Sequence, residues 1–202
     1  MKKNSIVIAA SAIAAMIVGV QTVSAEKVDL ASSIVTTNGN CCQETVDKVE
    51  TLVREYIPDE MYKDFQRSGW TIQVTEGDLN QEYSGNEKEM FSVTDYNQSC
   101  IKIEDESAAV KPYILLREFA RYLDSAYGDI SYTKTFKNEV YDKEKVIFDN
   151  TFETNSFNPH ELFASAVAIY MGGTEGKDLL EQHCPIIYMM IDNMFFEDVI
   201  VM

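Results

Sequence analysis

The sequence has 202 residues and a formal net charge of −16 at pH 7, from 17 Lys and Arg against 33 Asp and Glu. Such a charge repels phosphate backbones and anionic lipid, so nucleic acid and membrane surfaces are not expected partners. Because 46% of the residues are hydrophobic and 11% aromatic, the acidity does not indicate disorder, and we expect a globular domain with a packed core.

Residues 1–25 have the pattern of a signal peptide. Lys2 and Lys3 precede an apolar run over 6–20, and small residues follow up to Ala25. The run is shorter than the roughly 20 residues that a helix needs to cross a bilayer. We therefore expect cleavage after Ala25 and a secreted, extracellular product. An uncleaved N-terminal anchor is the alternative.

Removal of the leader takes away two lysines and no acidic residue, which moves the net charge from −16 to −18. The rest of the chain is long enough for one domain. We divide it into a polar, flexible lead-in over 26–43 and a folded domain over 44–202. We expect this product to be a monomer with no membrane attachment.

The four cysteines do not define a disulfide pattern; they are Cys41, Cys42, Cys100 and Cys184. An exported chain permits disulfides, but adjacent cysteines rarely bridge each other, and no Cys-x-x-Cys pair is present. Bridges from the adjacent pair to either distant cysteine and unpaired thiols both remain open.

The first half of the domain predicts helices followed by a short sheet. Apolar residues at helical spacing predict a helix over 46–56, which Pro58 ends, and a short helix over 59–66. Alternating apolar and polar residues predict three strands, with a polar loop at 76–89. These strands are expected over 70–75, 90–94 and 101–103.

The second half predicts mainly helices, expected over 113–127, 136–148, 159–171 and 185–196. Gly128 ends the first of them, and Asn158 with Pro159 begins the third as cap and first helical residue. The third is nearly all apolar after its first turn, so we expect it at the centre of the domain. Helices around a small sheet indicate an α+β fold.

The helix expected over 113–127 contains the sequence Arg117-Glu118-x-x-Arg121. Residues four apart share one face of a helix, so the two arginines lie together. With histidine at both arginine positions this would be a His-Glu-x-x-His motif, in which two imidazoles bind Zn²⁺ and the Glu activates water. Arginine stays protonated and has no lone pair for a metal, so it cannot take that role.

Three segments resemble the anthrax lethal factor-like metallopeptidases, a family that includes Pro-Pro endopeptidases; they are 69–74, 114–124 and 161–170. The resemblance extends over about residues 44–196. It implies a zincin-like metallopeptidase domain with a small sheet and several helices. It also implies that zinc is the family's cofactor, that Glu118 corresponds to the general base and that Glu161 corresponds to the third zinc ligand.

The chain departs from the family pattern at its functional positions. Arg117 and Arg121 stand where the family has its two histidine ligands, and Thr154 stands where it has an oxyanion-stabilising tyrosine. Because catalytic zinc needs about three protein ligands, we expect zinc binding to be lost, with no other cofactor. Two guanidinium groups could replace the charge of the metal, so we predict salt bridges with Glu118 and Glu161.

The resulting hypothesis is a secreted pseudo-metallopeptidase that binds a peptide or protein, with its status as an enzyme open. One alternative is an active zinc endopeptidase that uses a substitute ligand such as His160. Another is a structural or immunity-type acidic protein. The residues alone also permit a solvated helix face at 117–124 and a capping-box role for Glu161, three residues after Asn158. We expect His160 and His183 to be structural or exposed.

The leader generates a test of localisation. Expressed in a bacterial host with a standard secretion system, the protein should leave the cytoplasm with Glu26 as its first residue, because the peptidase reads the small residues before it. N-terminal sequencing of the exported protein measures this. Recovery of the intact chain from Met1 in the cytosol alone would contradict it.

Overall fold

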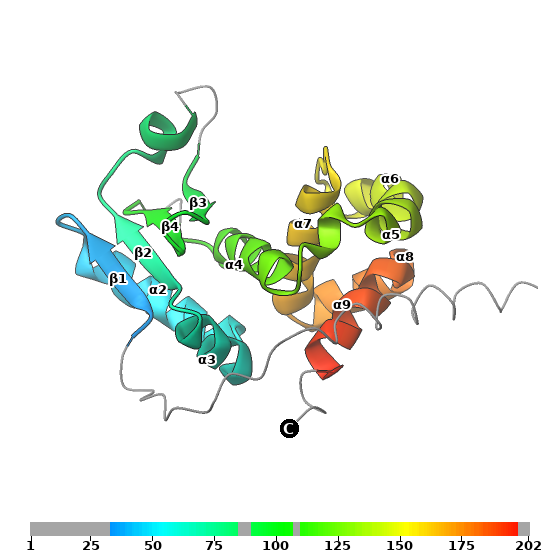
Figure 1. Ribbon diagram of the computed structural model, residues 1–202, viewed down its shortest axis with the longest axis horizontal. Coiled ribbons are helices and arrows are strands. Elements are labelled where there is room, and N and C mark those ends of the chain that lie inside the picture. Colours follow the sequence, from blue (N-terminus) through cyan, green and yellow to red (C-terminus); the bar gives the residue numbers. More distant parts are fainter. Residues whose placement is uncertain (1–32, 85–89, 107–109, 198–202) are drawn as a thin grey trace, which may run out of the picture. The chain divides into compact units, whose positions relative to one another are not determined.

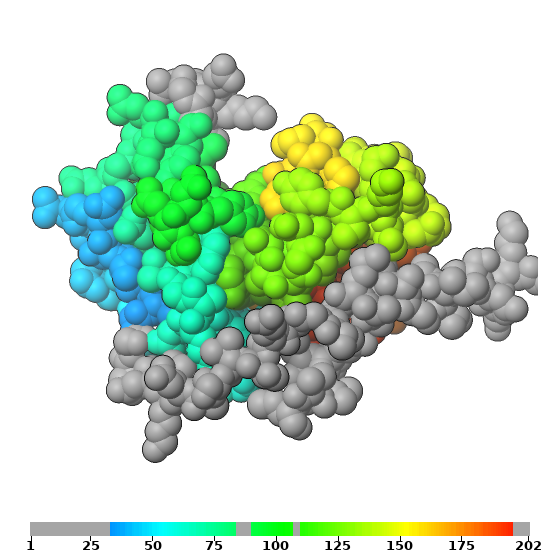
Figure 2. Space-filling view, in the orientation of Figure 1, coloured from blue at the N-terminus to red at the C-terminus, as the bar shows by residue number. Residues whose placement is uncertain are grey.

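The computed structural model describes residues 33–84, 90–106 and 110–197 (Figure 1), which Figure 2 shows coloured in a space-filling view. The predicted leader over 1–25 therefore lies outside the described residues. The described chain divides into two compact units, one up to Phe119 and one from Ala120 onward. We call them the sheet unit and the helical unit. The division falls within helix α4 (Pro112–Ala126).

The sheet unit contains a mixed sheet in the order β1-β2-β4-β3. Its strands are β1 (Val35–Asn38), β2 (Thr71–Thr75), β3 (Ser92–Asp95) and β4 (Cys100–Glu104). The first two and β4 run parallel, whereas β3 is antiparallel to β4 and forms an edge of the sheet. In the β2–β4 register Ile72 lies opposite Ile101, and both are fully buried.

The expectation of a flexible lead-in over 26–43 is wrong for residues 35–38, which form β1. Val35 lies opposite Ile72 and Asn38 opposite Thr75, and the preceding Ile34 is buried. The short β-branched run favours a strand, but its hydrogen-bond partners are more than thirty residues away in sequence. The local pattern therefore could not reveal the pairing.

Helices α2 (Gln43–Tyr56) and α3 (Asp59–Arg67) complete the sheet unit, close to their expected bounds. Phe65 of α3 is fully buried, and its ring lies 5.4 Å from that of Phe119. A short π-helix, η1 (Asn80–Ser84), occupies part of the region expected as loop. An ion pair with the sheet stabilises η1, since Lys102 Nζ of β4 lies 2.7 Å from Glu82 Oε1.

The helical unit is built around α7 (Pro159–Met171), where the sequence predicted a central helix. Every residue from Leu162 to Ala168 is buried. Around it lie η2 (Ile130–Tyr132), α5 (Lys134–Phe136), η3 (Lys137–Tyr141), α6 (Asp142–Phe152), α8 (Thr174–His183) and α9 (Pro185–Glu197) (Figure 1). The helix expected over 136–148 is thus divided among α5, η3 and α6.

No predicted element covered helix α8, which begins directly after a glycine pair and contains Gly176. That glycine permits a close helix contact: a Cβ at Gly176 would lie 2.4 Å from the carbonyl oxygen of Ile169 in α7. Packing against α7 therefore outweighs the low helix propensity of glycine.

All four cysteines are free thiols, and Cys100 and Cys184 are buried. Among the described helices, none has the length and apolar composition needed to cross a bilayer.

A buried carboxylate from α6 caps the start of α9. Glu144 Oε1 accepts a hydrogen bond from Ile186 N at 2.8 Å, and Oε2 accepts one from Ile187 N at 2.9 Å. Burial raises the pKa of Glu144 above its ordinary value of 4.5, although both hydrogen bonds act in the opposite direction. The cap joins two helices far apart in sequence.

This cap predicts different effects for two substitutions. Glu144→Ala removes both acceptors and should lower the free energy of unfolding by about 1–3 kcal/mol, because two backbone N–H groups lose their partners. Glu144→Gln keeps an acceptor without the buried charge and should cost less. Urea denaturation measures both variants. Equal losses would show that the cap does not depend on an acceptor.

The raised pKa adds a pH dependence with a definite sign. The folded state holds the Glu144 proton more tightly than the unfolded state, so this group's contribution to stability increases as pH falls through the folded pKa toward about 4.5. Glu144→Gln should lack that contribution. A wild-type and a Gln variant with the same dependence on pH above about 4.5 would contradict this assignment.

Candidate functional site

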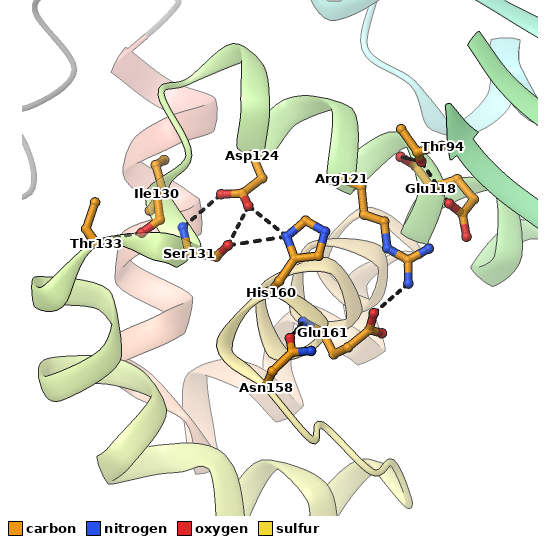
Figure 3. Close-up of polar contacts among 10 residues, drawn as sticks. All are labelled: Thr94, Glu118, Arg121, Asp124, Ile130, Ser131, Thr133, Asn158, His160 and Glu161. Atoms are coloured by element: carbon orange, nitrogen blue, oxygen red, sulfur yellow. Dashed lines mark hydrogen bonds and ion pairs between the residues drawn. The ribbon is translucent and has the colours of Figure 1, made fainter. Parts of the chain in front are cut away.

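The helical unit contains an ion pair between two residues that the sequence singled out. Arg121, near the end of α4, places Nη2 2.7 Å from Glu161 Oε1 in the first turn of α7 (Figure 3). Their side chains are 16% and 11% exposed, so water screens the pair only in part. The structure thus brings together the position expected for the second histidine ligand and the position expected for the third ligand.

The local sequence fixes where Glu161 lies. Asn158 caps α7, and its Oδ1 accepts a hydrogen bond from Glu161 N at 2.9 Å, while Pro159 begins the helix. The cap orients the first turn, and the carboxylate of Glu161 points to Arg121 (Figure 3). The Asn158 cap on the amide of Glu161 and the ion pair of the Glu161 carboxylate are therefore both present.

Glu118, the residue expected at the general-base position, is buried in the sheet unit with 2% of its surface exposed. Thr94 Oγ1 of β3 donates to Glu118 Oε2 at 2.7 Å, and Ser92 Oγ donates to Oε1 at 3.1 Å. A general base needs to reach the proton that it accepts, directly or through one water. Here both carboxylate oxygens accept hydrogen bonds from hydroxyl groups of a neighbouring strand.

Arg117 lies one turn before Arg121, in the part of α4 that belongs to the sheet unit, and it is partly buried. Its assignment to the first ligand position stays a prediction, as does the assignment of Glu118 as a remnant base.

Thr154, at the position expected for the family's tyrosine, lies in the loop between α6 and α7. Its hydroxyl donates to Asp149 Oδ1 at 2.9 Å, which also accepts from Ser156 N at 2.9 Å. Burial opposes the charge of Asp149, but these hydrogen bonds and one from Lys145 outweigh it and lower the pKa of the carboxyl. The Thr154 hydroxyl therefore stabilises the loop between α6 and α7.

A second polar cluster, which the sequence did not predict, adjoins the ion pair. Asp124 is fully buried and accepts hydrogen bonds from Ser131 N at 2.8 Å and from Ser131 Oγ at 2.5 Å. His160 Nδ1 lies 2.9 Å from Asp124 Oδ2 (Figure 3). The cluster joins α4, η2 and α7. Only the position of Asp124 beside the Arg117–Arg121 motif could have drawn attention to it.

These three residues do not form a nucleophilic triad. In such a triad one imidazole nitrogen faces the carboxylate and the other faces the serine. Here Ser131 Oγ lies 3.3 Å from Nδ1, the nitrogen that also faces Asp124, and Ser131 is only 1% exposed. The cluster positions the turn and the imidazole; it does not activate the hydroxyl.

The side chains around Glu161 do not supply the ligands that a catalytic zinc ion needs. Across residues 33–84, 90–106 and 110–197, no group of three or more His, Cys, Asp or Glu side chains is arranged to hold a metal. Beside Glu161 lies a guanidinium, which repels a cation and has no lone pair to donate. His160 could supply only Nε2, because Nδ1 faces Asp124.

The ion pair predicts a stability effect. Glu161→Ala should lower the free energy of unfolding by about 2–4 kcal/mol, because the largely buried Arg121 loses its carboxylate partner. Asn158→Ala, which removes the cap and keeps the pair, is the matched control and should cost about 1 kcal/mol. Chemical denaturation measures both. A Glu161→Ala cost no larger than that of the control would mean that the pair contributes nothing beyond the cap.

The fold has a counterpart among solved structures. No family model and no curated protein sequence matches the chain. The Pro-Pro endopeptidase PPEP-2 from Paenibacillus alvei matches in structure with a TM-score of 0.59 and 16% sequence identity, over 80% of this chain and 97% of that chain. The expected fold class is confirmed: the chain has an α+β fold that resembles a zincin-type peptidase.

Proposed function

We propose that this protein is a secreted pseudo-metallopeptidase of the lethal factor-like type, which binds a peptide and does not hydrolyse it. The observation that carries the proposal is the ion pair between Arg121 and Glu161. A guanidinium stands where a zinc ligand is expected, and it pairs with the carboxylate that would be the third ligand.

Electrostatics explains why this exchange is compatible with the fold. Glu161 is 11% exposed at its side chain, and a carboxylate so placed needs a nearby positive charge. A zinc ion supplies that charge in an active zincin, whereas Arg121 supplies it here through a charge-assisted hydrogen bond of 2.7 Å. The helices keep their electrostatic balance without a metal.

The absence of catalysis is supported by two further residues. The carboxylate of Glu118 is buried and accepts hydrogen bonds from Ser92 and Thr94. The hydroxyl of Thr154 donates to Asp149. Neither group is therefore arranged to activate water or to stabilise an oxyanion.

Peptide binding is proposed from the fold. The structural neighbour is an endopeptidase named for Pro-Pro sequences, so a proline-containing peptide is the natural first ligand class to examine. Extracellular action is proposed from the leader over 1–25.

Metal content is the decisive measurement. Purified wild-type protein should contain no stoichiometric zinc and should not cleave Pro-Pro peptides, because two of the expected ligand positions are arginines. Arg117→His combined with Arg121→His should create zinc affinity, since Glu161 then completes a three-ligand set. Elemental analysis and competition with a chelating dye measure it.

The matched control adds Glu161→Ala to the two histidine substitutions. It should lose the zinc affinity that the double variant gains, which separates a designed site from metal bound elsewhere. About one zinc per wild-type chain, removed by a chelator together with peptidase activity, would overturn the pseudoenzyme proposal.

A further inference from the structure

An exposed tyrosine beside the candidate site is held in a fixed position. Tyr132 is the most exposed large hydrophobic residue among those that the structure describes, at 72%. Its ring centroid lies 5.4 Å from that of His160, with the planes inclined by 33°. The imidazole therefore lies against the phenol ring, and most of the surface of Tyr132 is open to solvent.

The turn that carries this ring is anchored on both sides. The residue before it, Ser131, binds Asp124 through its amide and its hydroxyl, and Tyr132 N donates to Asp129 O at 3.0 Å. The residue after it, Thr133, donates through Oγ1 to Ile130 O at 2.8 Å. Asp124 also holds the supporting imidazole of His160.

A fixed, exposed ring loses little conformational entropy when a ligand covers it, so contacts with it contribute to affinity. The ring lies near the ion pair, because His160, which contacts Tyr132, immediately precedes Glu161 in the first turn of α7. We refer to Tyr132 with His160 as the ring platform.

Two properties of the molecule select the chemistry of the group that would cover the platform. The face of an aromatic ring carries partial negative charge and attracts cations such as ammonium and guanidinium. The whole chain has a net charge of −16, which raises the local concentration of cations and repels carboxylates. The exposed Asp129 at the start of the same turn adds to this preference.

We infer that the exposed ring of Tyr132 receives a lysine or arginine side chain of the peptide that occupies the candidate site. This inference rests on the proposed peptide-binding function and specifies the ligand as a basic peptide. The platform is preorganised by Asp124, so the two-ring arrangement exists before the ligand arrives.

Binding of two peptides tests it: an alternating Lys-Pro peptide and the same peptide with norleucine in place of lysine. The repeat places a lysine within reach in any register. By calorimetry the Lys-Pro peptide should bind the wild type more tightly than the norleucine peptide. Tyr132→Leu should weaken binding of the Lys-Pro peptide about two- to fivefold, because it removes the aromatic face. Tyr132→Phe should retain the affinity.

Charge and fold are controlled in the same experiment. Tyr132→Leu leaves the net charge unchanged, so nonspecific attraction of a basic peptide is equal in both proteins. Tyr96→Leu, at a tyrosine 46% exposed in the sheet unit, is the matched control and should leave the affinity unchanged. Circular dichroism checks that each variant is folded.

Two results would overturn the inference. Equal binding of the lysine and norleucine peptides would refute the cation preference and leave the proposed peptide-binding function standing. Equal affinity of Tyr132→Leu and wild type, or no binding of either peptide, would remove the platform from recognition. The pseudoenzyme proposal fails separately, through zinc stoichiometry.

Discussion

A carboxylate that is largely buried in the first turn of a helix needs a positive charge nearby. This requirement determines how the side chains of the helical unit are arranged. Asn158 caps α7 and so directs Glu161 toward α4, where Arg121 lies 2.7 Å away. One residue earlier, His160 contacts the buried Asp124 through Nδ1. Asp124 also accepts a hydrogen bond from the amide of Ser131 and so fixes that turn. Two neighbouring residues of one helix thus link three elements through charge and hydrogen bonds.

Under the proposed function, the same constraint explains how the fold can persist with arginines at the expected zinc-ligand positions. Zinc in an active site takes part in catalysis and also neutralises nearby carboxylates. Only the second role concerns the stability of the fold. Arg121 performs that second role and cannot perform the first, because it offers no lone pair. Glu118, at the expected general-base position, is buried, and its carboxylate accepts a hydrogen bond from the hydroxyl of Thr94 in β3.

Local patterns in the sequence predicted the elements whose signals are local. The cap at Asn158, the apolar α7 and the strand at Thr71–Thr75 follow from residues within each element. β1 and α8 did not follow, because β1 depends on pairing with β2 and α8 on a close contact at Gly176. The Arg121–Glu161 pair was reached through family resemblance, whereas the Asp124 cluster requires a contact to Ser131 in the next turn, which no spacing rule indicates.

The arginines at the two expected ligand positions would differ in how strongly they oppose metal binding. A guanidinium at position 121 lies 2.7 Å from the carboxylate oxygen that a metal would need, so it opposes a cation directly, by repulsion and by occupying the acceptor. Introducing histidine at position 117 alone would leave Glu161 Oε1 paired with Arg121. We therefore expect the arginine at position 121 to oppose a metal ion more strongly than the arginine at position 117. The carboxylate of Glu118 accepts hydrogen bonds from Ser92 and Thr94, so without any metal it contributes to the packing of α4 against β3.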